Sequence, residues 1–505
     1  MVKQSLIKGT VILGITGVFV RFLGLFFRWP IIMLIGDEGI GYYQMTYPLY
    51  MFFIGVASGM PVAISKMISE NNAINDRAEM FEIINKAMLV MIILGGGFSL
   101  AFILFPAQII KVFNWDTKTV YSLIGIGAAP VFIGIMSVYR GFFQGMQNMI
   151  PTSISQLIEQ LGRVIFGVGL AFLLLPKGIE FSAGGAAFGA AAGGILGSFY
   201  LYIKFRKIKK SITFVKRKKD HKVLTQLLNI AIPISLGTSV GTIMNLIDSI
   251  LLPQKLLQAG YSYKEATILY GQLTGKAMVL INVPLTLSIA LSSSLIPIIA
   301  EAVALKKRME LINKVETSIK LSMVIALPST CGLFFLAYPI LALIFPGHSG
   351  GDMLLRYSSL IIPFIILTQI STALLQGTGH YNIPIKNLLI GCIFKIVITI
   401  LIVPIKNVNI YGAVIGTLVA YFITSLLNMI ALHRRLGITV NYYDIVIKPA
   451  YASVIMTIGV VFMYQYVYNY TISNAAACIT SVLSGGLLYV LMMLLFGVFK
   501  YQHQK

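Results

Sequence analysis

Residues 9–35, GTVILGITGVFVRFLGLFFRWPIIMLI, decide the fold class of this chain. A helix needs about 20 mostly apolar residues to cross a bilayer, and this run exceeds that length with Arg21 and Arg28 as its only charged side chains. Because a backbone in lipid must satisfy its own hydrogen bonds, the run predicts a membrane-spanning helix. It is also far longer than the apolar part of a cleavable leader, so we expect it to stay in place as an anchor.

The composition extends this interpretation to the whole chain of 505 residues. Apolar residues make up 57% and charged residues 11%, whereas a soluble domain has about 25% charged residues, and the mean hydropathy is +0.86. These values exclude a soluble enzyme, a disordered chain and a disulfide scaffold. We expect an all-α integral membrane protein with about 14 transmembrane helices. The predicted spans are 9–35, 42–68, 80–105, 118–143, 151–175, 183–205, 224–252, 271–299, 316–345, 353–376, 383–404, 410–432, 445–468 and 475–499.

The Lys and Arg residues predict the orientation of these spans. If the N-terminus is cytoplasmic, and cations near a span end are counted with the adjoining loop, 27 of the 35 Lys and Arg residues outside the span interiors fall on the cytoplasmic side and 8 on the outer side. This distribution follows the positive-inside rule. We therefore expect a multi-pass protein of the cell membrane with both termini in the cytoplasm. Most of the net charge of +22 then reflects topology, and we expect no nucleic-acid partner.

The largest group of cations lies between spans 6 and 7, from Lys204 to Lys222. Two interpretations are open for it. It could contact anionic lipid of the inner leaflet, or it could be a linker that fixes the orientation of two halves of the chain. We favour the linker.

An internal duplication supports that division into halves. Gln144 begins a Gln-Gly pair and Arg163 follows 19 residues later; Gln376 and Lys395 repeat this arrangement with the same separation. Spans 6 and 12 also open on related sequences, GAAFG at 185–189 and GAVIG at 412–416. Six spans per half predict two lobes related by a pseudo-two-fold axis along the membrane normal, as in parallel-repeat transporters. The alternative is a duplication retained only for packing.

The repeat sets the predicted domain boundaries. Spans 13 and 14 and the following tail are an addition to the two lobes. The domains are an N-lobe at 1–205, a basic cytoplasmic linker at 206–223, a C-lobe at 224–436 and the C-terminal addition at 437–505.

Charged residues inside the spans are the candidates for function, because a charge in the membrane is costly and usually has a role. Four cations stand against two acids, which favours an anionic cargo. The cations are Arg21, Arg28, Arg163 and Lys395, and the acids are Glu159 and Asp248.

Span 1 places small residues and arginines on one helix face. Gly14, Gly17, Arg21, Gly24 and Arg28 follow one another at intervals of three and four residues, which brings them to the same side of a helix. A guanidinium can bind phosphate with two parallel hydrogen bonds, so this face suits a cavity with an anionic ligand. Alternatively, the glycines form a helix-packing seam and Arg28 extends to the interface.

Span 5 carries a second polar stripe with Gln156, Glu159 and Arg163. Glu159 and Arg163 stand four residues apart and could form a structural pair within the helix, or both could line the cavity. Lys395 has no acid at helical spacing in its own span, so we expect it to bind the cargo or a partner from elsewhere. Asn245 and Asp248 of span 7 could extend the polar site, although Asp248 lies near the outer end and could reach the interface instead.

Three stretches of the sequence resemble the polysaccharide transporters and MurJ-like lipid II flippases of the multidrug/oligosaccharidyl-lipid/polysaccharide exporter superfamily, in particular a branch acting in sporulation. They are GDEGIGYYQM at 36–45, YRGFFQGMQNMIP at 139–151 and the outer segment LPQKLLQAGYS at 252–262 with EATILYGQLTG at 265–275. The resemblance extends over essentially the whole chain. It implies a flippase that moves a lipid-linked peptidoglycan or polysaccharide precursor to the outer leaflet for spore cortex synthesis.

The resemblance also implies roles for particular residues. Arg21 and Arg28 match cavity arginines on the first helix of such flippases. Lys66 lies at the inner end of span 2, so the second helix offers no mid-span arginine and departs from the family pattern. Spans 13 and 14 of such flippases are associated with a groove for the lipid tail, and residues 451–499 here hold no charge before Lys500.

Two other functions stay open from the sequence. One is an ion-coupled antiporter for drugs or metabolites on the same fold, and the other is a membrane scaffold for cell-wall synthesis proteins. We expect no enzymatic activity, no metal site and no cofactor; a coupling ion or the membrane potential could drive transport. The expected partners are an anionic lipid-linked oligosaccharide precursor, membrane lipids and cell-wall synthesis proteins.

Overall fold

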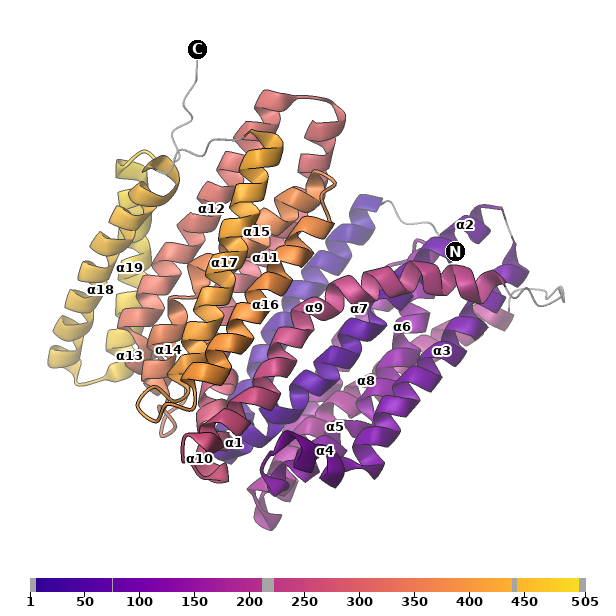
Figure 1. The fold of residues 1–505 in the computed structure, drawn as a ribbon, viewed down its shortest axis with the longest axis horizontal. Coiled ribbons are helices and arrows are strands. Elements are labelled where there is room, and N and C mark those ends of the chain that lie inside the picture. The colour runs from indigo at the N-terminus through magenta and orange to yellow at the C-terminus, as the bar shows by residue number, and fades with distance from the viewer. Residues whose placement is uncertain (1–5, 75, 211–221, 438–442, 499–505) are drawn as a thin grey trace. The chain divides into compact units, whose positions relative to one another are not determined.

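The chain is helical throughout its described part. A computed structural model describes residues 6–74, 76–210, 222–437 and 443–498, and within these ranges it contains helices and turns but no β-strand (Figure 1). The prediction of an all-α protein is therefore confirmed.

The chain forms two compact units. The first comprises Met1–Leu257 with Tyr261–Gly271, and the second comprises Gln258–Gly260 with Gln272–Lys505. The helices of the first unit are α1 (Leu6–Ala57), α2 (Gly59–Ala73), α3 (Arg77–Leu104), α4 (Pro106–Phe113), η1 (Thr117–Thr119), α5 (Val120–Gly127), α6 (Ala129–Gly145), α7 (Ile150–Leu174), η2 (Leu175–Lys177), α8 (Ile179–Lys210), α9 (Lys222–Gln258) and α10 (Tyr263–Gly271). Those of the second are η3 (Gln272–Ala277), α11 (Met278–Ala304), α12 (Arg308–Phe335), α13 (Ala337–Ile344), α14 (Asp352–Ser359), α15 (Ile362–Gly377), α16 (Asn382–Ile402), α17 (Tyr411–Leu436), η4 (Tyr443–Ile447), α18 (Lys448–Thr471) and α19 (Asn474–Leu495).

Helix α1 is long enough to contain a change of direction between the first two predicted spans. Its backbone leaves the helical conformation at Gly36, where φ is 61° and ψ is −164°. Only glycine adopts such a conformation without strain. The apolar run Phe26–Ala73 has 48 residues, about twice the length that one crossing needs.

In the described part, 11 helical runs are long and apolar enough to cross a membrane, or 13 if two bent runs are counted as crossings. The bent runs are Lys222–Ser239 with Gly241–Gln258 and Asp352–Ser359 with Ile362–Gly377. Residues 6–35 before Gly36 and residues 37–73 after it are each long enough for one crossing, and counting them as two crossings accounts for the difference from the 14 predicted spans. The chain is thus a multi-pass membrane protein.

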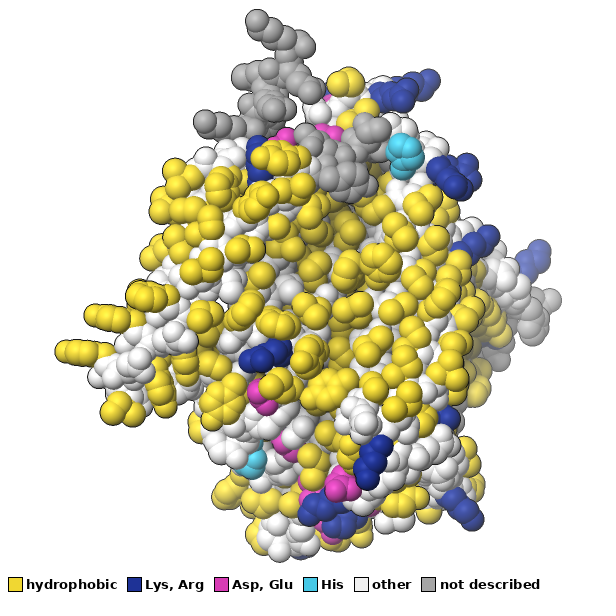
Figure 2. All heavy atoms as spheres, turned by 60° about the vertical axis from the view of Figure 1, so that its left-hand side comes forward, with side chains coloured by type: hydrophobic (Ala, Val, Ile, Leu, Met, Phe, Trp, Pro, Cys, Tyr) yellow, Lys and Arg dark blue, Asp and Glu magenta, His cyan; other side chains and the backbone are white. Residues whose placement is uncertain are grey.

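The apolar surface agrees with this conclusion. Figure 2 shows one face on which hydrophobic side chains cover most of the middle, while Lys, Arg, Asp and Glu side chains gather mainly toward the upper and lower margins. In α18 and α19, Phe462 and Leu487 are among the large apolar side chains that are more than half exposed. Such exposure is typical of a lipid-facing surface.

Helix α9 packs as part of the first unit, although the predicted C-lobe begins with it. The indole Nε1 of Trp115 donates to the Ser249 carbonyl at 2.7 Å, and Gln254 Nε2 donates to the Phe113 carbonyl at 3.0 Å. These bonds attach the end of α9 to the segment around α4. The compact units therefore divide the chain after α10, whereas the predicted lobes divide it at 206–223, of which residues 211–221 lie outside the described ranges. The lobe boundaries stay a prediction.

Glycines bring α7 and α8 into close backbone contact. On α8 they recur every four residues, which forms a smooth stripe along one face; the stripe consists of Gly185, Gly189, Gly193 and Gly197. A Cβ on Gly193 would lie 2.2 Å from the Glu159 carbonyl oxygen, and one on Gly189 would lie 2.6 Å from that of Arg163. Larger residues there would push the two helices apart, so the stripe fixes the position of Glu159 and Arg163.

The α16–α17 pair of the second unit uses the same register. A Cβ on Gly416 would lie 3.3 Å from the Lys395 carbonyl oxygen, and one on Gly412 would lie 2.9 Å from the Val403 nitrogen. Gly185 and Gly189 approach the corresponding positions of α7, near Leu170 and Arg163. The duplicated sequences therefore form duplicated helix pairs, each with its cation at the same place.

Candidate substrate-binding site

A cluster of buried charges lies where α6 meets α7. Arg140 donates from Nη2 to Glu159 Oε2 at 2.9 Å and from Nε to the Ser155 hydroxyl at 2.9 Å. Arg163, one turn after Glu159, places its Nη2 3.5 Å from Glu159 Oε1. The side chains of Arg140, Glu159 and Arg163 are 16%, 17% and 13% exposed. One carboxylate thus serves two guanidiniums.

Tyrosines from α1 complete the surroundings of Arg163. Its Nη2 donates to the Tyr50 hydroxyl at 3.0 Å, its Nη1 donates to the Tyr47 hydroxyl at 3.5 Å, and its guanidinium lies 5.7 Å from the centre of the Tyr50 ring. The rings of Tyr43, Tyr47 and Tyr50 follow one another at 5.5 and 5.8 Å. This row of rings offers the aromatic and hydroxyl surface that sugars and cations both contact.

The charges of this cluster do not balance. Arg140 and Arg163 carry two positive charges against one negative charge on Glu159, and burial makes an uncompensated charge costly. Among the described residues, no hydrogen-bond acceptor meets the buried Arg163 Nε or the buried Nη1 of Arg28. Unsatisfied buried donors are rare, so both groups are suited to bind an anion.

The α1 candidates lie beside this cluster or on the same helix. Gly24 faces α7, where a Cβ on it would lie 3.5 Å from Gln160 Nε2. Arg28 is half-buried, and Tyr43 is within electrostatic reach of both Arg28 and Arg163. Arg21 belongs to α1, but its side chain lies outside the described part of the structure, so its role stays a prediction.

The remaining candidates occupy other places. Gln156 is half-buried on α7, one turn before Glu159. On α9, Asn245 is exposed and Asp248 is half-buried. Lys395 is 3% exposed inside the second unit. Its predicted position across a shared cavity from Arg163 stays a prediction.

Sequence reasoning missed Arg140 and the tyrosines. Arg140 lies near the predicted cytoplasmic end of span 4, where a cation usually serves topology. The short turn between α6 and α7 brings it back against Ser155, 15 positions later, and against Glu159. Tyr47 and Tyr50 stand three residues apart in an apolar run and therefore read as packing residues.

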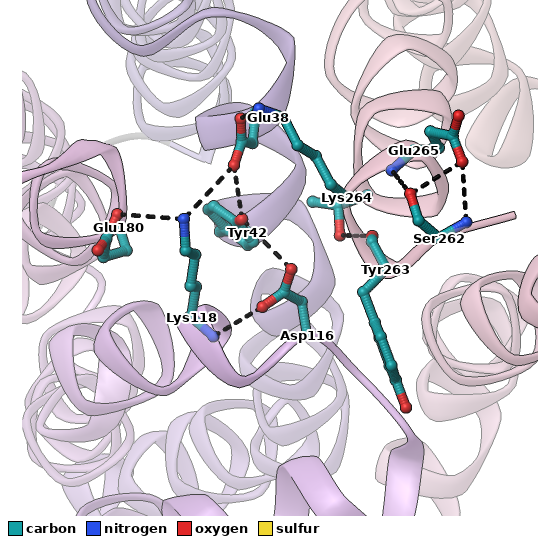
Figure 3. A network of polar contacts seen from close by, with 10 residues as sticks. Glu38, Tyr42, Asp116, Lys118, Glu180, Ser262, Tyr263, Lys264 and Glu265 are labelled. Carbon is teal, nitrogen blue, oxygen red and sulfur yellow. Dashed lines mark hydrogen bonds and ion pairs between the residues drawn. The ribbon is translucent and has the colours of Figure 1, made fainter.

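A second polar network joins four segments at the other end of the first unit (Figure 3). Tyr42 donates to Glu38 Oε1 at 2.9 Å and lies 3.4 Å from Asp116 Oδ2. Lys118 lies 3.9 Å from Glu38 and 4.0 Å from Glu180, and Lys264 lies 3.1 Å from Glu38. Glu38 therefore links α1, η1 and α10, on the side that the charge distribution predicts to be outside.

Helix α10 is held tightly against α1 at this end. A Cβ on Gly41 would lie 2.3 Å from the Thr267 carbonyl oxygen, and one on Gly271 would lie 2.4 Å from that of Asp37. The Glu265 carboxylate accepts from the backbone and hydroxyl of Ser262 at the start of α10, an arrangement that stabilises a helix N-terminus. These contacts fix α10 against the part of α1 that follows Gly36.

The sequence of this chain is similar to those of known proteins. Residues 6–303 match the sequence profile of a family described as "Polysaccharide biosynthesis protein". The chain is 29% identical to Stage V sporulation protein B of Bacillus subtilis (strain 168), over 99% of this chain and 97% of that protein. It is 27% identical to the Lipid II flippase MurJ of the same organism, over 88% of this chain and 85% of that protein.

A solved structure shares the fold. The inward closed conformation of a lipid II flippase MurJ superposes with a TM-score of 0.71 at 18% identity, over 96% of this chain and 99% of that chain. The match extends over both compact units and the C-terminal helices. It supports the all-α architecture predicted from the sequence.

Proposed function

Because this chain belongs to the family of polysaccharide biosynthesis proteins, we propose that it is a flippase for a lipid-linked precursor of peptidoglycan or a related polysaccharide. The cargo is an anionic, undecaprenyl-pyrophosphate-linked sugar, carried from the inner to the outer leaflet by alternating access. The similarity to a lipid II flippase and to a sporulation protein supports this cargo class and a role in spore cortex synthesis.

The observation that carries the proposal is the excess positive charge buried beside the tyrosine row. A pyrophosphate needs donors in pairs, which guanidiniums supply, and a sugar needs flat apolar faces with hydroxyl groups nearby. Arg163 combines both, because it contacts Glu159 on one side and Tyr50 on the other. A carrier of cationic drugs would instead need an excess of buried carboxylates.

The sequence of events follows from this electrostatics. Without cargo, the cations repel one another in a medium of low dielectric constant, which favours an open, hydrated site. A bound pyrophosphate neutralises them and so favours closure of the inner side and opening of the outer side. We infer that Arg21, Arg28 and Lys395 join Arg163 in this step, and that the membrane potential or a coupling ion resets the empty protein.

The test is transport of fluorescent lipid II in liposomes that contain only this protein. A membrane-impermeant quencher then reports the fraction of lipid II in the outer leaflet over time. We expect wild-type protein to move the lipid and Arg21→Ala to abolish movement, with Arg21→Lys restoring part of it because an ammonium lacks the paired donors. Membrane insertion of each variant serves as the control.

Two results would contradict the proposal. Liposomes that leave lipid II in place but accumulate a soluble cationic dye would favour the antiporter. Normal spore cortex synthesis by cells whose protein lacks Arg21, Arg163 and Lys395 would favour a scaffold.

A further inference from the structure

The first unit holds a cavity whose lining includes none of Arg140, Glu159 and Arg163. Its volume is about 450 Å³, and it lies where the ends of α3, α6 and α8 meet. Its lining includes Asn85, Met88, Tyr139, Tyr202, Arg206 and Lys209. Among the described residues that line it there are two cations and no carboxylate.

The inner wall of the cavity is aromatic. Phe205 lies at the centre of a cluster, with its ring 5.2 Å from Tyr139 and 5.2 Å from Phe142. Tyr202, which is about half exposed, continues the cluster at 6.4 Å from Tyr139. Tyrosine rings with one apolar and one polar end are typical of the membrane–water interface, so this wall suits the junction between a lipid headgroup and its chains.

The outer rim of the cavity is cationic. Arg206 and Lys209 are exposed on the last turns of α8, at the end of the apolar run Ile179–Lys209. The positive-inside rule assigns this end to the cytoplasmic side. Lys204 and Lys207 are exposed on the same turns but do not line the cavity; Lys204 Nζ lies 5.7 Å from the centre of the Tyr200 ring.

We propose that this cavity binds an anionic phospholipid of the inner leaflet. Arg206, together with Lys209, holds the phosphate, while the aromatic wall contacts the glycerol and the first methylenes. Basic pockets between helices on the cytoplasmic side bind anionic headgroups in this way. The aromatic wall and the adjoining lipid favour a phospholipid over free phosphate, which would need more donors and no apolar surface.

A lipid in this cavity would act close to the candidate transport site. Tyr139 lines the cavity, and the next residue of α6, Arg140, pairs with Glu159. The proposal depends on the predicted orientation of α8 and does not depend on the identity of the cargo. Lipid binding and lipid II movement are therefore tested by separate measurements.

The experiment measures phospholipid retained by the full-length protein in detergent, by native mass spectrometry, with phosphatidylglycerol and phosphatidylcholine as probes. We expect a clear preference for phosphatidylglycerol. Arg206→Gln with Lys209→Gln should weaken its binding roughly 10- to 30-fold, because each cation near an anionic lipid surface strengthens binding about fivefold. The matched control, Lys204→Gln with Lys207→Gln, removes the same charge from the same helix and should change binding less than about twofold.

Three results would overturn the proposal. Equal losses in the two double variants would show diffuse attraction to a basic helix. Equal retention of both lipids by wild-type protein would remove the headgroup selectivity. Complete displacement of phosphatidylglycerol by inorganic phosphate at constant ionic strength would assign the cavity to a soluble phosphate.

Discussion

The α7–α8 pair of the first unit and the α16–α17 pair of the second unit have the same register and different electrostatics. Residues of α6 and α7 correspond to those 232 positions later, as Arg163 does to Lys395, and residues of α8 to those 227 positions later, as Gly189 does to Gly416. By the same offsets, Glu159 corresponds to Gly391 and Arg140 to Thr372. The positions equivalent to Glu159 and Arg140 therefore hold uncharged residues in the second unit.

Neutral side chains near these positions form a hydrogen-bonded group in the second unit. Asn387, the counterpart of Ser155, donates to Asn428 at 2.8 Å, and Asn428 donates to the hydroxyls of Ser371 and Thr372 at 3.1 and 3.2 Å. These hydrogen bonds link α15, α16 and α17, whereas an ion pair links α6 and α7. The same helix register therefore accommodates an ionic cluster in one unit and neutral hydrogen bonds in the other.

Removing Glu159 should produce the largest effect and test this difference directly. Glu159→Gln leaves two buried guanidiniums without their shared carboxylate, and breaking a buried ion pair costs about 3–5 kcal/mol. Asn387→Ala removes the hydrogen bond from Asn387 to Asn428 and should lower the free energy of unfolding by about 1–2 kcal/mol. The midpoint of thermal unfolding in detergent ranks the two. Adding Arg140→Gln to Glu159→Gln should restore part of the loss, and equal losses in the two single variants would remove the distinction between the units.

The shared register predicts the next largest effect. Gly193→Ala places a Cβ against a carbonyl and should cost about 1–3 kcal/mol through displaced helices. Gly391→Ala should do the same in the second unit, because its Cβ would lie 2.3 Å from the Thr424 hydroxyl. Thr424→Gly should rescue part of that loss, whereas no side-chain change can move the carbonyl opposite Gly193. Gly169→Ala is the control, since nothing lies within 4 Å of its Cβ, and its unfolding midpoint should not fall.

The two cations should contribute unequally to cargo binding. Glu159 already neutralises part of the charge on Arg163, whereas α16 offers no acid at helical spacing to Lys395. We therefore expect Lys395→Gln to weaken binding of lipid II about tenfold, equivalent to about 1.4 kcal/mol, and Arg163→Gln to weaken it less. Equilibrium binding of labelled lipid II to purified protein measures both. The opposite order would mean that Arg163 acts as a free cation despite its partner.

The smallest effects should come from the tyrosine hydroxyls. Tyr50→Phe removes a 3.0 Å hydrogen bond to Arg163 and should weaken lipid II binding about fivefold, as expected for loss of about 1 kcal/mol. Tyr47→Phe removes a contact of 3.5 Å and should change binding less than about twofold. If both changes leave binding unaltered while Tyr50→Ala abolishes it, the rings rather than the hydroxyls contact the cargo.

Sequence patterns predicted the elements that depend on local periodicity. Apolar runs predicted the helices. The 19-residue spacing from Gln144 to Arg163 and from Gln376 to Lys395 predicted that Arg163 and Lys395 are equivalent positions. The contacts of Gly189 with Arg163 and of Gly416 with Lys395 agree with this. The Glu159–Arg163 pair followed from a spacing of four residues within one helix. The sequence left two interpretations open for it; the structure contains the pair, and cargo binding by these residues stays a prediction.

What the sequence could not give depends on contacts between segments far apart in the chain. Tyr50 and Arg163 are 113 residues apart, so no periodicity relates them. The packing of α9 with the first unit rests on hydrogen bonds such as Trp115 to Ser249, which span 134 residues. Arg140 lies near the end of a predicted span, where most cations fix the orientation of the helix in the membrane. The positive-inside rule therefore does not distinguish it from a cation with a further role.

The facing positions of the two helix pairs decide where an acid can be accommodated. Glu159 stands opposite Gly197, where a Cβ would lie 3.7 Å from the Glu159 Cβ, whereas Gly391 stands opposite Thr424. A Cβ at position 391 would lie 2.3 Å from the Thr424 hydroxyl and 2.7 Å from the Ala420 carbonyl oxygen. A second acidic site engineered at position 391 therefore needs a smaller residue at 424 and a wider separation of the two helices.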